Sequence, residues 1–594
     1  MADLGASVVE ELRGIGVGRG DLVALALAPK VGLGLTPGGG SYSLAVRSEG
    51  DGDDDAGGPV AVVRRVEEEL RPRWVLWSHE TALTLVRSGL RVVTCWDILA
   101  VHRLLFGESR ADPARVWARL HDLPLDTLPA TAARPLDLFS QADDGDSDPD
   151  TPVRADGHVK AAWLTGRWAD TPERMERWAE LGLQAAALQA RRLAELHERP
   201  RAAATARSES AAELLCAELS VDGLPMDRSV AEHLVAGFVG PRPRTESEAA
   251  QLRARRDDEV LRHAPTDGQR FDLRSPGQVR SLLRRVGIEV ADTRAWRLEA
   301  LRVTHPVVDA LLAWRKAERV ATTYGYAWLD ENLDADGRLR GTWTGSDGAA
   351  GRMTASAGLH NMPAGMRAAV AAEAGHVLVR ADLGQIEPRV LAAVSGDEGL
   401  RRATRADDMY APLARDLGVD RETAKVAMLG AMYGQTTGHG AQVVRRLTAA
   451  YPVAMAYLED GDRSGQAGRD LHTYGGRLVR MGPATDDGIS DQEARSRAAA
   501  RGRYGRNALV QGAAAELFKV WAVTVRARGA ALAARIVLCL HDELLVHVPT
   551  ENGPAAAQLV EDCLREAARR WVPDDSVRFV ADISVIQRWS DAKA

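Results

Sequence analysis

Three acidic residues beside apolar runs are the first candidates for chemistry. Asp382 follows the apolar run 377–380 in HVLVRADLGQIEPRV, and Asp542 and Glu543 divide the two apolar runs of RIVLCLHDELLVHVP (535–549). Carboxylate oxygens are ligands that Mg²⁺ prefers. In a two-metal site, one ion activates the attacking oxygen and the other stabilises the leaving oxygen. Each acid taken alone is more often a turn or cap residue, so the pattern needs support from other segments.

A third segment places two cations and an aromatic ring at helical spacing. In DRETAKVAMLGAMYGQ (420–435), four residues recur every four positions and share one helix face: Arg421, Lys425, Leu429 and Tyr433. Arginine offers a bidentate fork to a phosphate, and lysine offers a compact point charge. Such a face can hold a triphosphate at one end and a base at the other. The same pattern also suits an amphipathic helix with a solvated basic side.

The elements that position these residues can be predicted locally. The sequence predicts a strand over 377–380 that runs into Asp382, and a helix from about Gln385. The second acidic segment reads as a β-hairpin with its acids at the turn. The third reads as a helix that begins at the N-cap Asp420 and ends at Gly434. Two carboxylates at rigid strand ends can converge on one metal pair.

Together, and in this order, the three segments resemble the family A DNA polymerases, the DNA polymerase I type. That family has D-x-S-Q-I-E-x-R, then R-x-x-x-K-x-x-x-F/Y-x-x-x-Y-G, then V-H-D-E; here these are DLGQIEPR (382–389), the helix 421–434 and LHDE (540–543). Four further segments match between them or before them: FDLRSPGQVRSLL (271–283), GRMTASAGLHNMP (351–363), YGGRL (474–478) and RYGRNALVQGAAAELFK (503–519). The resemblance covers about residues 205–594.

The resemblance implies a DNA-directed DNA polymerase that adds dNTPs to the 3′-hydroxyl of a primer on a template. It implies two Mg²⁺ ions, for which Mn²⁺ can substitute, held by Asp382, Asp542 and the backbone carbonyl of Leu383, with Glu543 as an auxiliary ligand. Lys425 is implied to be catalytic together with the two aspartates, as a proton donor to the leaving pyrophosphate.

The resemblance also implies the contacts to nucleotide and DNA. Arg421 and Lys425 neutralise the β- and γ-phosphates, Tyr433 packs under the incoming sugar and base, and Glu387 crowds the 2′ position and excludes ribonucleotides. Leu429 and Gln385 complete the nucleotide site. The residues implied to contact DNA are Arg352, Asn361, Arg503, Asn507, Gln511 and His541. For Asn507 and Gln511, packing of their helix on a neighbour is the competing interpretation.

The sequence departs from the family pattern at several positions. Leu383-Gly384 replaces the usual Tyr-Ser, Leu429 replaces an aromatic residue, and Pro388 follows the glutamate. None of these changes removes a metal ligand or a phosphate-binding cation. Two alternative functions remain: a single-subunit RNA polymerase-like enzyme, against which Glu387 argues, and a non-catalytic DNA-binding relative, against which the intact aspartates and cations argue.

The N-terminal 200 residues occupy the place of the family's 3′–5′ exonuclease domain. Asp97 matches the final Asp of one exonuclease segment, but Glu80 is the only acid near the other expected position. The late Y-x-x-x-D signature has become Trp178 and Gly182, and the strand in DLVALALAPKVGLGL (21–35) lacks its acids. Because such a nuclease needs about four carboxylates, we expect this domain to be inactive, as in an actinobacterial-like form without a 5′-nuclease domain.

The predicted fold class is α+β and multidomain. An N-terminal RNase H-like, exonuclease-type α/β domain precedes a right-hand polymerase with an antiparallel palm sheet, helical fingers and a helical thumb. In the N-terminal domain, the sequence predicts strands over 74–77 and 90–94 between helices, then a long helix over 173–198. The expected divisions are 1–195 (exonuclease-like), 196–204 (linker), 205–345 (thumb and start of palm), 346–400 (palm), 401–500 (fingers) and 501–594 (palm).

Composition and charge set the remaining expectations. The chain of 594 residues is 45% hydrophobic and carries a net charge of −7. Two acidic stretches, 49–55 and 143–156, each carry −5 and read as loops, which leaves a mildly basic remainder of +3 that suits a polyanionic partner. Neither a membrane span nor a secretory signal is indicated. The four dispersed cysteines suit a reducing compartment. We therefore expect a cytoplasmic, nucleoid-associated monomer with no membrane partner.

Overall fold

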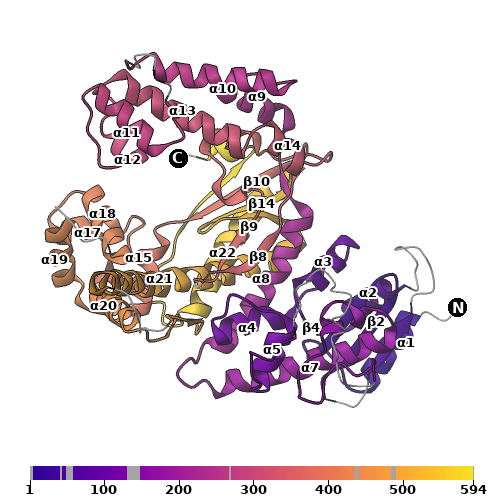
Figure 1. Cartoon of the computed structure of the whole chain (residues 1–594). Helices are drawn as coiled ribbons and strands as arrows, with labels where there is room; N and C mark the ends of the chain where they lie inside the picture. Colours follow the sequence, from indigo (N-terminus) through magenta and orange to yellow (C-terminus); the bar gives the residue numbers. More distant parts are fainter. Residues whose placement is uncertain are drawn as a thin grey trace. The chain divides into compact units, whose positions relative to one another are not determined.

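The chain is described by a computed structural model that covers residues 4–39, 43–47, 58–129, 148–265, 269, 271–348, 350–434, 440–482 and 490–592. It divides into two compact units, each built from segments that lie far apart in the sequence (Figure 1). Unit 1 comprises Met1–Asp222, Thr342–Thr354 and Val379–Val585. Unit 2 comprises Gly223–Gly341, Ala355–Leu378 and Ile586–Ala594.

A five-stranded sheet forms the N-terminal part of unit 1. Its order is β3-β2-β1-β4-β5, with antiparallel pairing among the first three strands and parallel pairing of β1 with β4 and of β4 with β5. The strands are β1 (Leu22–Ala28), β2 (Gly32–Pro37), β3 (Leu44–Arg47), β4 (Arg73–Leu76) and β5 (Cys95–Asp97).

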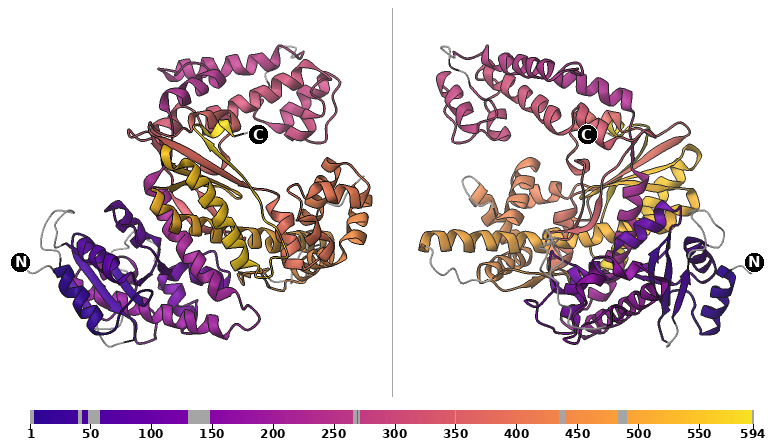
Figure 2. Two further views of the ribbon diagram at one scale, coloured as in Figure 1. Left: turned by 180° about the vertical axis from the view of Figure 1, so that it is seen from behind. Right: turned by 45° about the vertical axis from the view of Figure 1, so that its right-hand side comes forward.

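Helices cover both faces of this sheet (Figure 2). The strand LVALALA alternates its side chains, so Val23 and Leu25 join one apolar core while Ala24 and Ala26 join the other. The helices are α1 (Leu4–Gly14), α2 (Pro59–Leu70), α3 (His79–Arg87), α4 (Ile98–Phe106), α5 (Pro113–Leu120), α6 (Ala161–Leu164) and α7 (Pro172–Glu195). The predicted long helix over 173–198 is confirmed as α7.

The strand predicted over 90–94 is wrong. The strand is β5 at Cys95–Asp97, where Cys95 lies opposite Trp74 of β4. Leu90 and Val92 are buried, as their apolar character indicates, but they lie on an irregular segment that follows Gly89, whose φ is +71°. Apolar burial without sheet pairing therefore explains this run. The two acidic stretches fall partly outside the description: 49–55 and 143–147 are not covered, and 148–156 forms turns with one isolated bridge.

A second sheet of four strands has the order β13-β14-β10-β15. The antiparallel hairpin of β13 and β14 confirms the predicted one. The strands are β10 (His376–Leu383), β13 (Arg535–Cys539), β14 (Glu543–Pro549) and β15 (Ala581–Ile586). The long helix α21 (Asp491–Gly529) packs on α8 (Ala202–Asp222), α20 (Pro452–Gln466) and α22 (Gly553–Trp571).

Helix α21 and its continuation, Asp491–Leu532, contain one stretch long and apolar enough to cross a membrane by length and composition. Within the described residues, 83% of that stretch is buried inside the protein. The Trp521 indole, for example, donates to the carbonyl of Val560 at 3.0 Å. Such burial is typical of a core helix, so the stretch is weak evidence for a membrane span.

Helices between β10 and α21 form a largely helical subdomain of unit 1. Helix α18 begins after the N-cap Asp420, whose side chain accepts from the backbone N–H of Thr423, and ends at Gly434 in the left-handed region. Both ends were predicted from the sequence. The helices are α15 (Ile386–Ser395), α16 (Glu398–Ala403), α17 (Tyr410–Leu417), α18 (Arg421–Tyr433) and α19 (Gly440–Ala450), followed by the short strands β11 (Leu471–His472) and β12 (Leu478–Val479).

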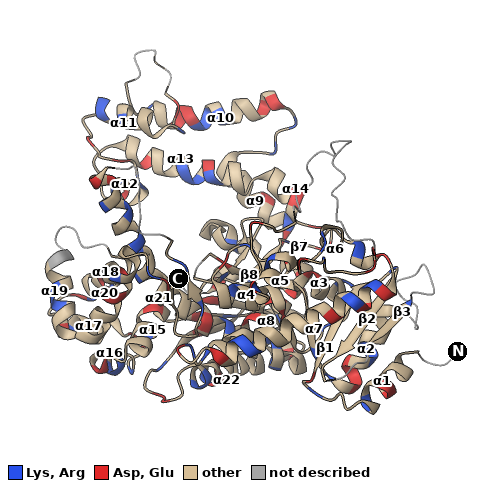
Figure 3. Cartoon of the chain, turned by 60° about the horizontal axis from the view of Figure 1, so that its bottom comes forward, with Lys and Arg blue, Asp and Glu red and all other residues tan. Residues whose placement is uncertain are grey.

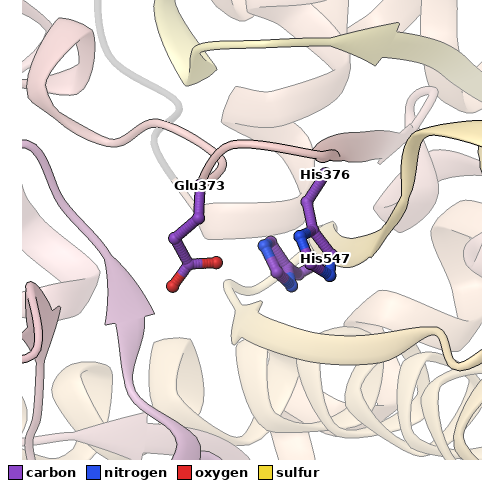
Figure 4. A group of neighbouring side chains, drawn as sticks. All are labelled: Glu373, His376 and His547. Atoms are coloured by element: carbon purple, nitrogen blue, oxygen red, sulfur yellow. The ribbon is translucent and has the colours of Figure 1, made fainter.

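Unit 2 is mostly helical and has a core of its own. Acidic and basic positions alternate along α10 and α13 (Figure 3), and Glu318 of α13 pairs with Arg256 at 3.4 Å and with Arg274 at 2.7 Å. Its helices are α9 (Arg228–Val239), α10 (Glu246–Leu261), α11 (Pro276–Arg285), α12 (Ala295–Glu299), α13 (Pro306–Thr323) and α14 (Tyr326–Asn332). Glu373 lies on the segment that leads into β10, and His376 is the first residue of that strand (Figure 4).

Candidate active site

The two predicted metal-binding aspartates lie at the ends of neighbouring strands, one in β10 and one just before β14. Asp382 is the next-to-last residue of β10, and Asp542 lies in the turn that precedes β14. The backbone N–H of Leu383 donates to the carbonyl of Asp542 at 2.8 Å, which fixes the two acidic positions side by side. The chain 160 residues downstream of Asp382 therefore returns to the same point.

Arg380 is a site residue that the sequence interpretation missed. Its guanidinium donates to the Glu543 carboxylate at 2.6 Å, to Asp582 of β15 at 3.1 Å and to Asp382. Residues two apart in a strand share a face, so the charged Arg380 inside an apolar strand was the available signal. Asp582 on β15 carried no comparable local signal. Glu543 is buried and paired to Arg380, which favours a supporting role for it over an exposed metal ligand.

Burial and crowding of negative charge shift the acidic groups. The pKa of Asp382 is raised to about 6, first by burial and then by the charge of Asp542. The pKa of Asp542 is also raised, first by burial and then by Glu543. Arg380 opposes the shift at Asp382 but does not cancel it. Additional positive charge next to the two carboxylates would therefore favour their ionised forms.

The turn between β10 and α15 is held by a buried arginine. Arg389 is fully buried and donates to the carbonyls of Gly384 at 2.9 Å, Thr404 at 2.7 Å and Ala406 at 2.8 Å. Gln385 has a left-handed φ of +50°, and its side-chain oxygen accepts from the backbone N–H of Met409 at 3.2 Å. Gln385 thus ties this turn to the start of α17, in addition to lining the pocket described next.

A pocket of about 350 Å³ has both Asp542 and Glu387 in its lining. The Glu387 carboxylate accepts from the Tyr433 hydroxyl at 2.6 Å and from Arg352 at 3.0 Å. Burial and this hydrogen bond raise the pKa of Tyr433 to about 12, so its hydroxyl stays protonated. Predicted site residues in the lining are Arg352, Leu383, Gln385, Glu387, Leu429, Tyr433, His541 and Asp542.

The two cations of α18 lie toward the other end of that helix. Arg421 pairs with Asp408 at 2.6 Å, and its guanidinium lies 5.7 Å from the Tyr410 ring centre. Lys425 lies 3.9 Å from Glu422 and leaves 43% of its side chain exposed. Leu429 and Tyr433 line the pocket, while Arg421 and Lys425 are not among its lining residues in the described chain. Phosphate binding by both cations stays a prediction.

Residues of α21 present a second predicted face. Arg503, Asn507 and Gln511 recur every four residues and are exposed or partly exposed. Gly434 approaches Arg503 so closely that a Cβ there would lie 3.0 Å from the arginine side chain.

Within unit 2, the carbonyl of Asn361 accepts from Arg319 at 2.8 Å. The pKa of His541 is lowered by partial burial and by the charge of Arg352. DNA contacts by these residues stay predictions.

In the N-terminal domain, tryptophan side chains lie around Gly182, where a nuclease acid was expected. Trp77 and Trp178 stack with ring centres 4.7 Å apart, and the Trp77 indole donates to the Trp178 carbonyl at 3.1 Å. A Cβ at Gly182 would lie 3.3 Å from that indole nitrogen. Trp77 and Trp178 belong to the same core cluster as Ala24 and Ala26 of β1.

Asp97, the one matching acid of that domain, has a structural role. Its carboxylate caps α4 by accepting from the N–H of Ala100 at 2.8 Å. It is 1% exposed, and burial together with the charge of Glu213 raises its pKa well above the usual range. Glu80 is exposed at the start of α3, and its backbone N–H donates to the Ser78 hydroxyl.

Comparison with known proteins supplies the family. The model of DNA polymerase family A matches residues 244–591, which is more than half of the chain. The thermostable DNA polymerase I of Thermus aquaticus is 30% identical over 386 residues, which cover 58% of this chain and 44% of that protein. The DNA polymerase I of Chloroflexus aurantiacus is 31% identical over 312 residues, 48% of this chain and 32% of that protein.

One solved structure is similar over almost the whole chain. It is the POL domain of Pol1 from M. smegmatis, in complex with DNA primer-template and dNTP. The TM-score is 0.69 and the identity 21%, and the match covers 99% of this chain and 98% of that one. The likeness shows a shared fold. The chain itself spans less than half the length of the curated relatives it matches. On the match over residues 244–591, this chain belongs to DNA polymerase family A.

Proposed function

We propose that this chain is a template-directed DNA polymerase that adds dNTPs to the 3′-hydroxyl of a primer. The observation that carries the proposal is that Asp382, at the end of β10, and Asp542, in the turn before β14, lie side by side next to a pocket that Glu387 and Tyr433 line. Primer-template DNA and dNTPs are the proposed partners, because the similar Pol1 structure is a complex with both.

The acidic pair fits two divalent cations. Asp382 and Asp542 offer carboxylate oxygens, the donors that Mg²⁺ and Mn²⁺ accept, and Leu383 adds a backbone carbonyl. Burial and mutual repulsion raise the pKa of both carboxyl groups, and bound cations would relieve that repulsion. When bound, the ions supply activation of the attacking oxygen and stabilisation of the leaving oxygen.

The other residues of the site bind and orient the substrates. Lys425 and Arg421 neutralise the phosphates of the incoming nucleotide, and Lys425 gives a proton to the leaving group. Tyr433, held by Glu387, presents its ring to the sugar and base. Arg352 is fixed by the same carboxylate and lies close enough to His541 to lower its pKa, so both can face the primer end. Catalysis is then mainly positioning and charge stabilisation.

We propose that the N-terminal domain is an inactive exonuclease-like domain. The strand order β3-β2-β1-β4-β5 with helices on both faces supports the RNase H-like prediction. The tryptophan cluster and the buried cap Asp97 support the loss of activity. The expected divisions at 195, 205, 345, 400 and 500, a monomeric state and a cytoplasmic, nucleoid-associated location belong to the same proposal.

Primer extension tests the polymerase proposal. The full chain is given a labelled primer on a template, with dNTPs or NTPs, and with Mg²⁺ or EDTA. We expect extension that needs dNTPs and metal, and loss of extension by more than about a hundredfold in Asp382→Ala and Asp542→Ala. Glu551→Ala, an exposed acid outside the site, is the matched control.

Three results would contradict the proposal. Extension by either aspartate variant within tenfold of the parent would exclude the two-metal assignment. Preferential use of NTPs would favour an RNA polymerase. DNA binding without any extension by the parent chain would favour a non-catalytic relative.

A further inference from the structure

A second pocket, whose lining shares no residue with the pocket beside Asp542, lies within unit 1 and holds about 400 Å³. It is formed by the starts of β4 and β5, by α8, by α21 and by the end of α22. This volume is within the range of small-molecule sites. We call it the arginine pocket, because four arginines are in its lining: Arg73, Arg201, Arg207 and Arg570.

Three of these guanidinium groups have no acidic partner in the part of the chain that the structure describes. Among the described residues, no carboxylate lies within ion-pair distance of Arg73, Arg201 or Arg207. Arg73 makes one long contact, 3.5 Å to the Cys95 carbonyl, and its pKa is lowered by burial and by the nearby charge of Arg207. Arg201 lies 3.9 Å from the ring centre of Tyr474. By contrast, Arg256 and Arg274 of unit 2 pair with acids.

A buried donor in the same lining also lacks a partner within the described part of the chain. Trp571 is 5% exposed, and its indole nitrogen has no hydrogen-bond acceptor there. Tyr474 lies beside it, with ring centres 4.7 Å apart. A buried N–H without an acceptor is costly, so an acceptor atom of a ligand would relieve it.

The one acid among the described lining residues is already engaged. Glu516 accepts from the backbone N–H of Gly475 at 2.7 Å and from the Thr473 hydroxyl, and burial raises its pKa to about 7. It is therefore only partly ionised near neutral pH, and the four arginines of the lining outnumber it. Arg570 is the arginine with an acidic partner, Glu566. The balance of charge in the pocket favours an anion.

We propose that the arginine pocket binds a small phosphorylated ligand of nucleoside monophosphate size, through Arg73, Arg207 and the indole N–H of Trp571. Guanidinium groups recognise phosphate oxygens by paired hydrogen bonds. The pocket is too large for phosphate alone, and the rest of its lining includes the apolar side chains of Ala211, Val520 and Val523, which suit a base or sugar. This site is separate from the acidic pair, so its test does not depend on polymerase activity.

Titration calorimetry on the full chain tests the proposal. The probes are deoxyadenosine monophosphate and inorganic phosphate, with EDTA present to suppress metal-dependent nucleotide binding. We expect the nucleotide to bind at one site more tightly than phosphate does. The double variant Arg73→Gln/Arg207→Gln should weaken it by at least about tenfold, and Trp571→Phe by about three- to tenfold, because charged hydrogen bonds contribute more than neutral ones. Thermal unfolding checks that each variant is folded.

Matched controls locate the site. Arg191→Gln removes an exposed arginine of α7 outside the pocket and should leave binding unchanged. The proposal is overturned if the parent binds neither probe, if the double variant binds as the parent does, or if Arg191→Gln weakens binding equally. Loss of binding in Lys425→Gln would place the nucleotide on α18 instead. A further result would also overturn the proposal: the chain binds a single-stranded oligonucleotide through Arg73 and Arg207 but does not bind the nucleotide. These arginines would then be assigned to DNA binding.

Discussion

The ionised form of Asp382, which metal binding requires, lowers the stability of the folded chain. Its pKa of about 6 in the folded chain is above the ordinary value of 3.8, so the folded state binds this proton more tightly than the unfolded state does. The group therefore favours folding most below pH 4, and this contribution is lost as pH rises from about 4 through 6. Without metal, the ionised carboxylate destabilises the fold at neutral pH.

The first prediction follows from that sign. In EDTA, Asp382→Asn should become more stable relative to the parent as pH rises from 4 to 7. At pH 7 its thermal unfolding midpoint should be higher than that of the parent. Scanning calorimetry across this range measures the difference, and Glu551→Ala is the control. Added Mg²⁺ should raise the midpoint of the parent more than that of the variant. If Asp382→Asn proved less stable than the parent at pH 7, the electrostatic argument would be contradicted.

Glu387 combines a steric and an organising role. Its carboxylate lies between Tyr433 and Arg352 in the pocket, so shortening the side chain removes bulk and two hydrogen bonds together. We predict that Glu387→Ala lowers the discrimination of dNTP against NTP by at least about tenfold, and lowers dNTP efficiency as well. Glu387→Gln keeps the size and should retain most of the discrimination. Single-nucleotide incorporation kinetics with both sugars measure the ratio. If the parent and Glu387→Ala discriminated equally between dNTP and NTP, another residue would be responsible for excluding ribonucleotides.

Elements with strong local signals were predicted well, and residues whose role depends on tertiary contacts were not. The cap Asp420 and the stop Gly434 fix α18 from the sequence alone, and the alternation around the turn at 540–543 fixes the hairpin. Arg380 was missed because its three acidic partners come from β10, β14 and β15. The run over 90–94 was misassigned because apolar character reports burial, and burial does not require sheet pairing.

A buried charge network joins elements that are distant in the sequence. Glu209 of α8 pairs with Lys519 of α21 and with Arg477 of the β11–β12 turn, each at 2.7 Å, and all three are at most 3% exposed. Arg477 lies in the YGGRL segment and Lys519 ends the 503–519 segment, both matched to the family by sequence. Glu209 therefore joins α8 to α21 through Lys519, and α8 to the β11–β12 turn through Arg477.

The prediction for this network is a coupled loss of stability. Lys519→Met leaves Glu209 buried with one cation fewer, which should cost about 3 kcal/mol. Glu209→Gln should also destabilise, and the double variant should cost less than the two single changes added together. Thermal unfolding of the four chains measures the coupling. The exposed Lys316→Met is the control and should change little. Additive losses would show that the pair does not interact.

At the level of the whole molecule, the family model and the structural likeness cover different parts of the chain. The family model spans 244–591, and the N-terminal sheet lies outside it. The similar Pol1 structure covers nearly all of the chain, so the shared fold includes the N-terminal sheet. The N-terminal part has retained its apolar cores, and its acids at the expected nuclease positions are few.

The last prediction concerns that N-terminal part: the full chain should not shorten a primer from its 3′ end. A two-metal nuclease needs several carboxylates around its ions. Here position 182, where an acid is expected, is a glycine that lies against Trp77. Small residues of β1 pack in the tryptophan cluster, and the Asp97 carboxylate caps α4. A labelled primer with a mismatched 3′ end, incubated with Mg²⁺ or Mn²⁺ and no dNTPs, should stay intact. The decisive contrary result is metal-dependent shortening that survives Asp382→Ala and disappears in Asp97→Asn, since asparagine still caps the helix but cannot serve as an anionic ligand.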